Sequence, residues 1–262
     1  MNLSQVNFYR QSVQCMFCGS DKMRANKYRR RIYWENLKFS YLYCRKCRGY
    51  SLSPILEEHQ LAKLYSLDYE VINATPGSTY ADYLVNHGYT FSISYLKTRL
   101  RPGTLICDFG CGTDSTLREV SISLGAKYIG VEYDQSVVDK LLRENPENIY
   151  LTPDQFAQTN MLFDYIFIGD VLEHVSSPSD ILITIKKRLK PEGEILIQGP
   201  LENSLSLLHL LIKVKSLAIR GKITSQSPYH VSLASRKSIL RLFARNNLQT
   251  CHFQTFEVPW PV

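Results

Sequence analysis

The chain has 262 residues, of which 44% are hydrophobic, so it can bury a full core and still hold a small extra module. Residues 1–14 contain no apolar run, and the most apolar window, residues 205–219, is short and interrupted by His and Lys, so we expect neither a secretory signal nor a membrane span and place the protein in the cytoplasm. The net charge of +7 lies entirely in residues 1–60, which hold 11 Lys+Arg and 4 Asp+Glu.

Two matched Cys-x-x-Cys pairs, Cys15/Cys18 and Cys44/Cys47, stand 25 residues apart near the N-terminus. Two such pairs on two turns can close a tetrahedral zinc site, and four cysteine ligands make that site structural. Redox-active pairs or unrelated core cysteines are the alternatives, and the repeated spacing disfavours both. We expect a zinc-ribbon-like module over residues 1–52.

The basic residues of this module concentrate at 27–31. They suit RNA or DNA phosphates, but equally an anionic substrate such as a nucleotide-sugar diphosphate, or simply a solvated face. The alternating aromatic residues at 39–43 predict a half-buried strand. For residues 28–34 the sequence does not decide between a strand and a surface on which bases stack.

A helical linker or lid region is expected over residues 53–100. Ser53-Pro54 opens a predicted helix that runs to about Leu67, and residues 75–78 form a loop. A helix or helix pair over residues 80–100 then leads into the first strand of the next domain.

The most informative stretch is the apolar run at residues 104–107, which is followed by Asp108 and by a Gly-x-Gly pair at Gly110 and Gly112. The glycines let the backbone turn sharply and approach a ligand closely. A helix is predicted to follow, and its free N–H groups would face that ligand. The pattern indicates a nucleotide-like cofactor at the end of the first strand of a doubly wound sheet. Ser115 stands where a dinucleotide fingerprint needs its third glycine.

Residues 108–113 resemble motif I of class I S-adenosylmethionine (SAM) methyltransferases, whose usual form is Asp-x-Gly-Cys-Gly-x-Gly. The resemblance implies an α/β, Rossmann-like SAM-binding domain over residues 101–262, with Cys111 in the cofactor loop. Asp114 departs from the motif, because a glycine usually stands there. A carboxylate at this position would crowd the SAM carboxylate, bind its ammonium group, or stabilise the helix N-terminus.

Residues 127–132 predict a second strand that ends in Glu132, 24 residues after Asp108. This spacing is close to that of the acid that accepts both ribose hydroxyls, so Glu132 is expected to bind the ribose, with Tyr133 beside it. Residues 148–151 predict a third strand. The resemblance implies two adenine-side residues just after that strand, although polar residues there also serve as ordinary turn formers: Asp154 and Gln155.

A fourth apolar strand precedes the run Asp170-Val171-Leu172-Glu173-His174. This run resembles motif IV of the small-molecule branch of the family, including the ubiquinone-biosynthesis type, and differs from the Asn/Asp-Pro-Pro-Tyr motif of enzymes that methylate amino groups of bases. The resemblance implies cofactor contacts at Asp170 and Val171, and His174 is a candidate general base. The Glu173-His174 pair could instead start a helix or bind a divalent cation such as Mg²⁺.

Beyond a helix from Pro178 to about Lys190 and a fifth strand, residues 201–222 are expected to form a helical insertion, with an amphipathic helix at 204–220. Three interpretations of this helix are possible: a packed surface helix, a substrate lid, or a contact with a membrane surface that carries a lipid-linked substrate.

The segment that ends in His230 precedes a predicted helix over residues 236–246. It resembles a methyltransferase family with a zinc-binding N-terminus that occurs among sugar and natural-product enzymes. That resemblance makes His230 a candidate substrate contact or general base, against a purely structural loop histidine. A sixth strand is expected at residues 250–258, and no residues remain for the antiparallel last strand of the class.

The favoured function is SAM-dependent methyl transfer to a small molecule, such as a sugar-like or hydroxyl-bearing metabolite, including a nucleotide-linked or lipid-linked sugar. An RNA methyltransferase that grips nucleic acid with the basic zinc module is the second hypothesis. A SAM-binding protein without catalysis is the third.

Overall fold

The computed structural model describes most of the protein, and its residues group into two compact units. Unit 1 comprises residues 1–67, 172–181 and 200–251, and unit 2 comprises the rest. The division of the chain at residues 52 and 100 stays a prediction. Asp114, Ser115, residues 27–30 and the amphipathic segment 204–220 lie outside the described residues, which are 9–10, 14–25, 31–34, 37–56, 60–61, 89–113, 116–201, 223–225 and 230–256.

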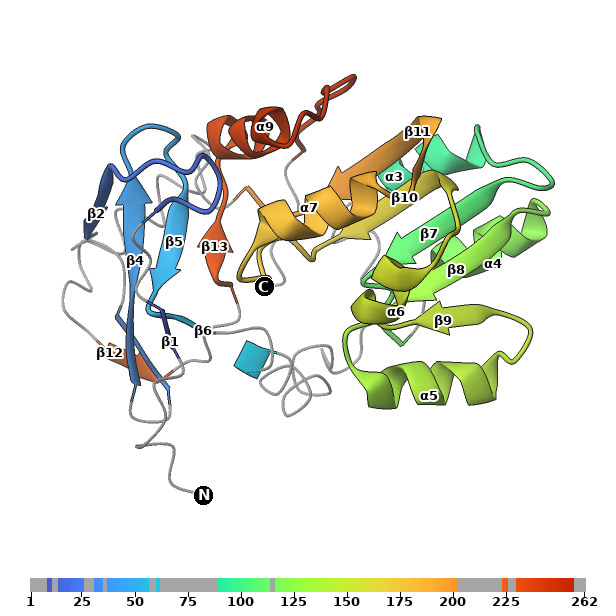
Figure 1. The fold of residues 1–262 in the computed structure, drawn as a ribbon, viewed down its shortest axis with the longest axis horizontal. Helices are drawn as coiled ribbons and strands as arrows, with labels where there is room; N and C mark the ends of the chain where they lie inside the picture. The colour runs from blue at the N-terminus through green and yellow to red at the C-terminus, as the bar shows by residue number, and fades with distance from the viewer. Residues whose placement is uncertain are drawn as a thin grey trace. The chain divides into compact units, whose positions relative to one another are not determined.

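Unit 2 is built on a parallel sheet of five strands in the order β11-β10-β7-β8-β9 (Figure 1). The strands are β7 (Leu105–Phe109), β8 (Lys127–Val131), β9 (Ile149–Leu151), β10 (Phe163–Gly169) and β11 (Leu189–Gln198). The strand order reverses direction at β7, where ligands bind in open α/β sheets. The predicted Rossmann-like α/β fold is therefore confirmed.

Helices alternate with these strands along the chain. They are α3 (Tyr89–Lys97), α4 (Thr116–Ser123), α5 (Gln135–Glu144), α6 (Pro153–Gln158) and α7 (Pro178–Lys186). One buried cluster joins α3, α4 and α5 to the central strands, with Leu96, Ile106 and Leu141 at 2% exposure or less. No helix among the described segments is long and apolar enough to cross a membrane.

The join between α7 and β11 differs from the prediction. α7 ends at Lys186 rather than near Lys190, because the backbone from Leu189 onward already pairs with β10. Phe163 pairs with Leu189 and Tyr165 with Glu194, so the residues between Leu189 and Glu194 form a bulge inside β11. A side chain at Gly193 would lie 2.9 Å from the carbonyl oxygen of Phe163, which explains the glycine.

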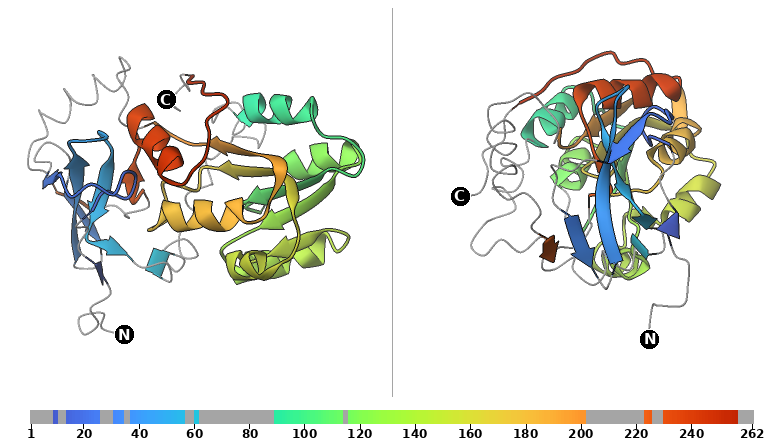
Figure 2. Two further views of the ribbon diagram at one scale, coloured as in Figure 1. Left: turned by 45° about the horizontal axis from the view of Figure 1, so that its top comes forward. Right: turned by 90° about the vertical axis from the view of Figure 1, so that its left-hand side faces the viewer.

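Unit 1 contains a second sheet, in the order β12-β3-β4-β5-β13, with β2 also paired to β4 (Figure 2). Its strands are β2 (Met23–Ala25), β3 (Arg31–Trp34), β4 (Leu37–Cys44), β5 (Tyr50–Ser53), β12 (Ile223–Ser225) and β13 (Ser232–Leu233). The strand predicted at residues 39–43 lies within β4, and part of the open segment 28–34 forms β3. The predicted helix at 236–246 is α9 (Arg236–Arg245), capped by Ser235.

Two secondary-structure predictions are wrong in the described residues. Ile55–Leu56 forms strand β6, paired with β1 (Tyr9–Arg10), where a helix was expected from residue 53. Both β6 side chains are buried, and burying adjacent side chains on opposite faces suits a strand better than a helix end. Residues 250–256 form no strand, and they are almost all exposed, unlike a strand of a covered parallel sheet.

Candidate cofactor and metal sites

The glycine loop after β7 is shaped by two left-handed glycines. Gly110 has φ of +86° and Gly112 has φ of +63°, backbone conformations that L-residues rarely adopt. A side chain at Gly110 would also collide with a methyl group of Val171. The N–H groups of Gly110 and Cys111 both donate to the Val131 carbonyl, which ties the loop to the end of β8.

Glu132 fastens this loop through its carboxylate. Oε2 accepts the Gly112 N–H at 2.9 Å, and Oε1 accepts the Tyr133 N–H at 2.7 Å. Burial raises the pKa of Glu132, and the backbone N–H donors oppose that shift. A carboxylate accepts about four hydrogen bonds, so capacity remains for a ligand hydroxyl. The ribose role of Glu132 stays a prediction, but the structure places its carboxylate beside the glycine loop.

Two further carboxylates lie at the carboxyl ends of neighbouring strands. Asp108 is buried near the end of β7 and accepts a hydrogen bond from the Tyr128 hydroxyl at 3.1 Å. Asp170 directly follows β10, and its φ of +49° is uncommon for a residue with a side chain. Since β7, β8 and β10 are parallel and in register at these ends, the acids gather at one edge of the sheet.

Asp170 is held in place by Tyr89, a residue that the sequence did not indicate as part of the site. Its hydroxyl donates to Asp170 Oδ2 at 2.8 Å, and its ring packs edge-on against Phe167. A side chain at Gly169 would lie 2.6 Å from the Tyr89 ring and hydroxyl, so that glycine leaves room for the contact. No local motif marks Tyr89, because the pairing depends on how α3 packs.

The cysteines of unit 2 are packing residues. Cys107 is fully buried in β7, and the Cys111 side chain packs against β8 beneath the loop. Burial raises the pKa of both thiols well above the usual range, which suppresses the nucleophilic thiolate. Only the backbone of Cys111 is thus suited to meet a cofactor.

The predicted adenine-side residues lie at the start of α6. Gln155 forms a capping box with Thr152, in which each side chain bonds the backbone N–H of the other residue. Asp154 is exposed in the first turn of the same helix. Their adenine roles stay predictions, and the amide oxygen of Gln155 already has a structural partner.

Unit 1 brings the four predicted metal-ligating cysteines together. The Sγ atoms of Cys15, Cys18, Cys44 and Cys47 all lie within 4.8 Å of one another. Cys15 and Cys47 are 3.4 Å apart, and Cys18 and Cys44 are 3.6 Å apart. Tetrahedral zinc with Zn–S bonds near 2.3 Å needs Sγ–Sγ separations of about 3.8 Å. The cluster therefore fits a closed zinc site.

A second potential ligand cluster in unit 1 joins Glu173, His174 and His230, whose ligand atoms also lie within 4.8 Å of one another. Glu173 Oε1 is 3.8 Å from His174 Nε2, and the imidazole centroids are 4.8 Å apart in an edge-on arrangement. The N–H groups of Val231 and Ser232 both donate to the Glu173 carbonyl, which fixes the two histidine segments side by side. Two imidazoles and a carboxylate suit zinc or another transition metal better than Mg²⁺, which prefers oxygen ligands.

The parallel sheet, the glycine loop and the acids at the strand ends together define a class I SAM-dependent methyltransferase domain. Residues 80–252 match the family model described as a methyltransferase domain. The chain therefore belongs to the methyltransferase domain family.

Individual relatives are more distant. The chain is 30% identical over 143 residues to ribosomal protein L11 methyltransferase of Thermosipho africanus, which covers 52% of this chain and 53% of that protein. It is 34% identical over 98 residues to ubiquinone biosynthesis O-methyltransferase of Roseobacter denitrificans, covering 35% of this chain and 39% of that protein. The chain thus spans about half the length, or less, of the curated relatives it matches.

Among solved structures, magnesium protoporphyrin IX methyltransferase from Synechocystis, with bound SAH, is 18% identical and has a TM-score of 0.49. The match covers 72% of this chain and 89% of that chain.

Proposed function

We propose that the protein transfers the methyl group of SAM to a hydroxyl-bearing small molecule, such as a sugar-like metabolite. The observation that carries the proposal is the hydrogen bond from the Gly112 N–H to Glu132, which joins the glycine loop to an acid at the next strand end. The resemblance of the zinc pairs and of the His230 segment to sugar and natural-product methyltransferases supports the acceptor class. A nucleotide-linked or lipid-linked sugar belongs to that class, and the cytoplasm is the proposed location.

The residues at the strand ends fit SAM chemically. SAM carries a positive sulfonium, an ammonium group and two ribose hydroxyls, and Asp108, Glu132 and Asp170 present negative charge and hydrogen-bond acceptors at one edge of the sheet. The glycine loop would let the backbone approach the methionine end closely, without side chains in the way. When bound, SAM would supply a methyl group already activated by its sulfonium for in-line transfer, so positioning is the main task of the protein.

The acceptor side of the proposal rests on His174 and His230. A hydroxyl acceptor must lose a proton, and an imidazole is the usual general base near neutral pH. Glu173, 3.8 Å from His174, stabilises the positive charge that the ring acquires when it takes that proton. Structural zinc at the four cysteines is part of this proposal and takes no part in the chemistry.

The first experiment measures SAM binding by calorimetry and methyl transfer with labelled SAM to nucleotide sugars, hydroxyl-bearing metabolites and total RNA. Glu132→Ala should weaken SAM binding strongly, whereas Asp139→Ala, an exposed acid on α5, should not. Absence of SAM binding by the zinc-loaded protein would refute the proposal. If RNA is the one acceptor that is methylated, the substrate is a nucleic acid, which is the alternative that the basic charge of unit 1 suggests.

The second experiment separates a base from a metal site at the two histidines. His174→Ala and His230→Ala should each lower kcat by about 10²–10⁴ and leave SAM affinity unchanged, with exposed His252→Ala as the control. Activity that is lost on mild chelation and restored by Mg²⁺, Mn²⁺ or Zn²⁺, while the structural zinc stays bound, would assign the cluster to a cation instead of a free base.

A further inference from the structure

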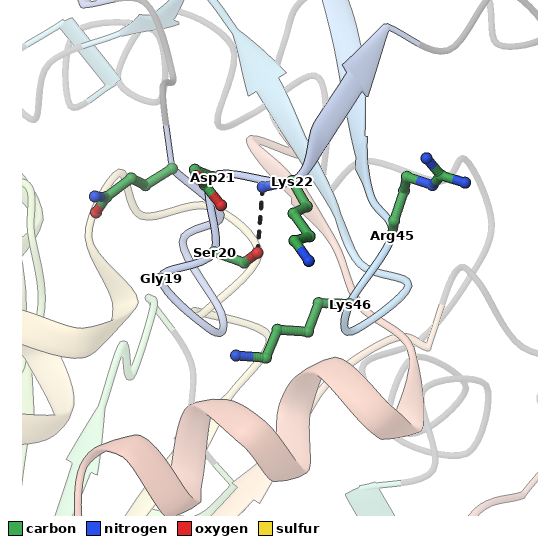
Figure 3. Close-up of a pocket in the computed structure, with 7 residues that line it drawn as sticks. Gly19, Ser20, Asp21, Lys22, Arg45 and Lys46 are labelled. Carbon is green, nitrogen blue, oxygen red and sulfur yellow. Dashed lines mark hydrogen bonds between the residues drawn. The ribbon is translucent and has the colours of Figure 1, made fainter.

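A hollow in unit 1 lies between the two cysteine-bearing turns (Figure 3). It has a volume of about 530 Å³, within the range of small-molecule pockets, which is about 300–1,000 Å³. Its lining includes Gly19, Ser20, Asp21, Lys22, Arg45 and Lys46.

The hollow is positively charged. The side chains of Lys22 and Lys46 point into it, whereas that of Arg45 points away from it (Figure 3). Three cations and the carboxylate of Asp21 give the lining a net charge of +2. Within the described part of the chain, the ion pairs involve none of these four residues. Their charges are therefore available to a ligand.

The backbone around the hollow is held by hydrogen bonds that also shape the cysteine turns. The Cys15 N–H donates to the Ser20 carbonyl, and the Arg45 N–H donates to the Lys22 carbonyl. A metal at the four cysteines would stiffen both turns further. The lysines therefore project from an ordered frame, which lowers the entropy lost when they hold a ligand.

Arg245 of α9 lies next to Gly19, one of the lining residues. Gly19 has φ of +66°, and a side chain there would lie 3.2 Å from the guanidinium carbon of Arg245. The absence of a side chain at Gly19 thus leaves room for the Arg245 guanidinium next to this lining residue. Guanidinium groups bind phosphate oxygens in a bidentate manner, and lysine ammonium groups bind them as point charges.

We infer that this hollow binds the phosphate groups of a small ligand, such as the diphosphate of a nucleotide-linked compound. Two of the cations, Lys22 and Lys46, point into one hollow instead of forming the extended stripe that a long nucleic acid contacts. Phosphate binding here goes beyond the proposed methyl transfer and does not depend on it.

Calorimetry on the zinc-loaded full chain, with inorganic pyrophosphate as the probe, tests the inference. The Lys22→Ala/Lys46→Ala double variant should weaken binding about tenfold or more, since two charge-assisted contacts are lost. Asp21→Asn should strengthen binding a few-fold, because it removes the opposing charge. Lys127→Ala, an exposed lysine at the start of β8, is the matched control and should leave binding unchanged. Zinc content and SAM affinity, measured on every variant, report folding of the two units separately.

Each outcome of these measurements either supports the phosphate site or overturns it. Binding of pyrophosphate and of a nucleoside diphosphate with equal affinity assigns the site to phosphate groups alone, and tighter binding of the nucleotide adds recognition of the nucleoside. No pyrophosphate binding at about 10 mM and low salt would overturn the inference. A double variant that matches the Lys127→Ala control would do the same, as would tight binding of a short single-stranded RNA that the Lys22→Ala/Lys46→Ala change weakens while pyrophosphate binding stays unaffected.

Discussion

Gly110→Ala tests the structural account of the cofactor loop most directly. An L-residue at φ of +86° costs about 1–2 kcal/mol relative to glycine. The new methyl group would also collide with Val171, and overpacking of this kind costs about 1–3 kcal/mol. The free energy of unfolding of the variant should therefore be about 2–5 kcal/mol lower than that of the wild type, for which about 5–15 kcal/mol is typical. For a protein of this size the melting temperature should fall by roughly 4–20 °C.

A double-mutant cycle separates the two causes. Val171→Ala alone removes two buried methyl groups and should cost about 1.6 kcal/mol. In Gly110→Ala/Val171→Ala the collision is gone while the backbone strain remains. The double variant should therefore be more stable than the sum of the single changes by about 1–3 kcal/mol.

Thermal melting, with hydrogen exchange of peptides from β7 and β8 as the local readout, measures this cycle. SAM affinity of each variant follows the loop itself. A Gly110→Ala protein that melts with the wild type would refute the loop conformation. If the effects of the two single changes on the free energy of unfolding simply add, the contact between residue 110 and Val171 does not constrain the loop conformation.

Other predictions concern the strands that frame the site. Asp164→Ala should lower the free energy of unfolding by about 1–3 kcal/mol, because Asp164 accepts the Leu105 N–H at 2.8 Å. Lys190→Ala should lower it by less than about 1 kcal/mol, since the ion pair between Lys190 and Asp164 is partly exposed. Denaturant titration compares the two variants. Burial raises the pKa of Asp164, but the N–H donor and Lys190 outweigh it and lower that pKa, so this stabilisation is present above the usual pKa of an aspartate and is lost as pH falls through the lowered value. Acid titration of Asp164→Ala should therefore show a shallower loss of stability than the wild type. Tyr89→Phe removes the hydrogen bond to Asp170 and should raise the Kd for SAM about tenfold with a small change in melting temperature; an unchanged Kd would mean that Tyr89 only packs.

The parallel strands could be predicted because each is a short apolar run that ends in a polar or glycine residue. The start of the last helix was equally readable, since a helix was expected from residue 236 and α9 begins at Arg236. The cysteine cluster followed from spacing alone, since two short turns bring two thiol pairs together. In each case the signal and the structure that it predicts lie within a few residues of one another.

Pairings between distant segments carried no such signal. β13 pairs with β5, and β12 pairs in parallel with β3, although about 180 or more residues separate the partners in sequence. The roles of side chains were also ambiguous: Asp134, which follows the predicted ribose residues Glu132 and Tyr133, caps α5 by accepting from the Ser136 N–H. A polar residue after a strand serves a helix end as readily as a ligand, and only packing decides between the two.

These long-range contacts make His230 depend on the cysteine centre within unit 1. The Tyr41 hydroxyl donates to the His230 carbonyl at 2.7 Å, and the Leu52 N–H donates to the Val231 carbonyl at 2.8 Å. The Ser235 hydroxyl donates to the carbonyl of Cys47, itself one of the four clustered cysteines. The segment that carries His230 is thus bonded to β4, to β5 and to the second cysteine turn.

Loss of a metal from the cysteines should therefore disturb His230. Cys44→Ser, or chelation strong enough to remove zinc, should shift the imidazole NMR signals of His230 and speed hydrogen exchange in β13, while amides of β7 and β8 in unit 2 keep their protection. Tyr41→Phe is the matched control: it should move the His230 signals and leave the zinc content at one ion per chain. If zinc leaves and the cysteine turns open while His230 keeps its signals, the hydrogen bonds from Tyr41 and Ser235 do not transmit order from the metal centre. If the signals move in both variants, the zinc positions a candidate base without taking part in its chemistry.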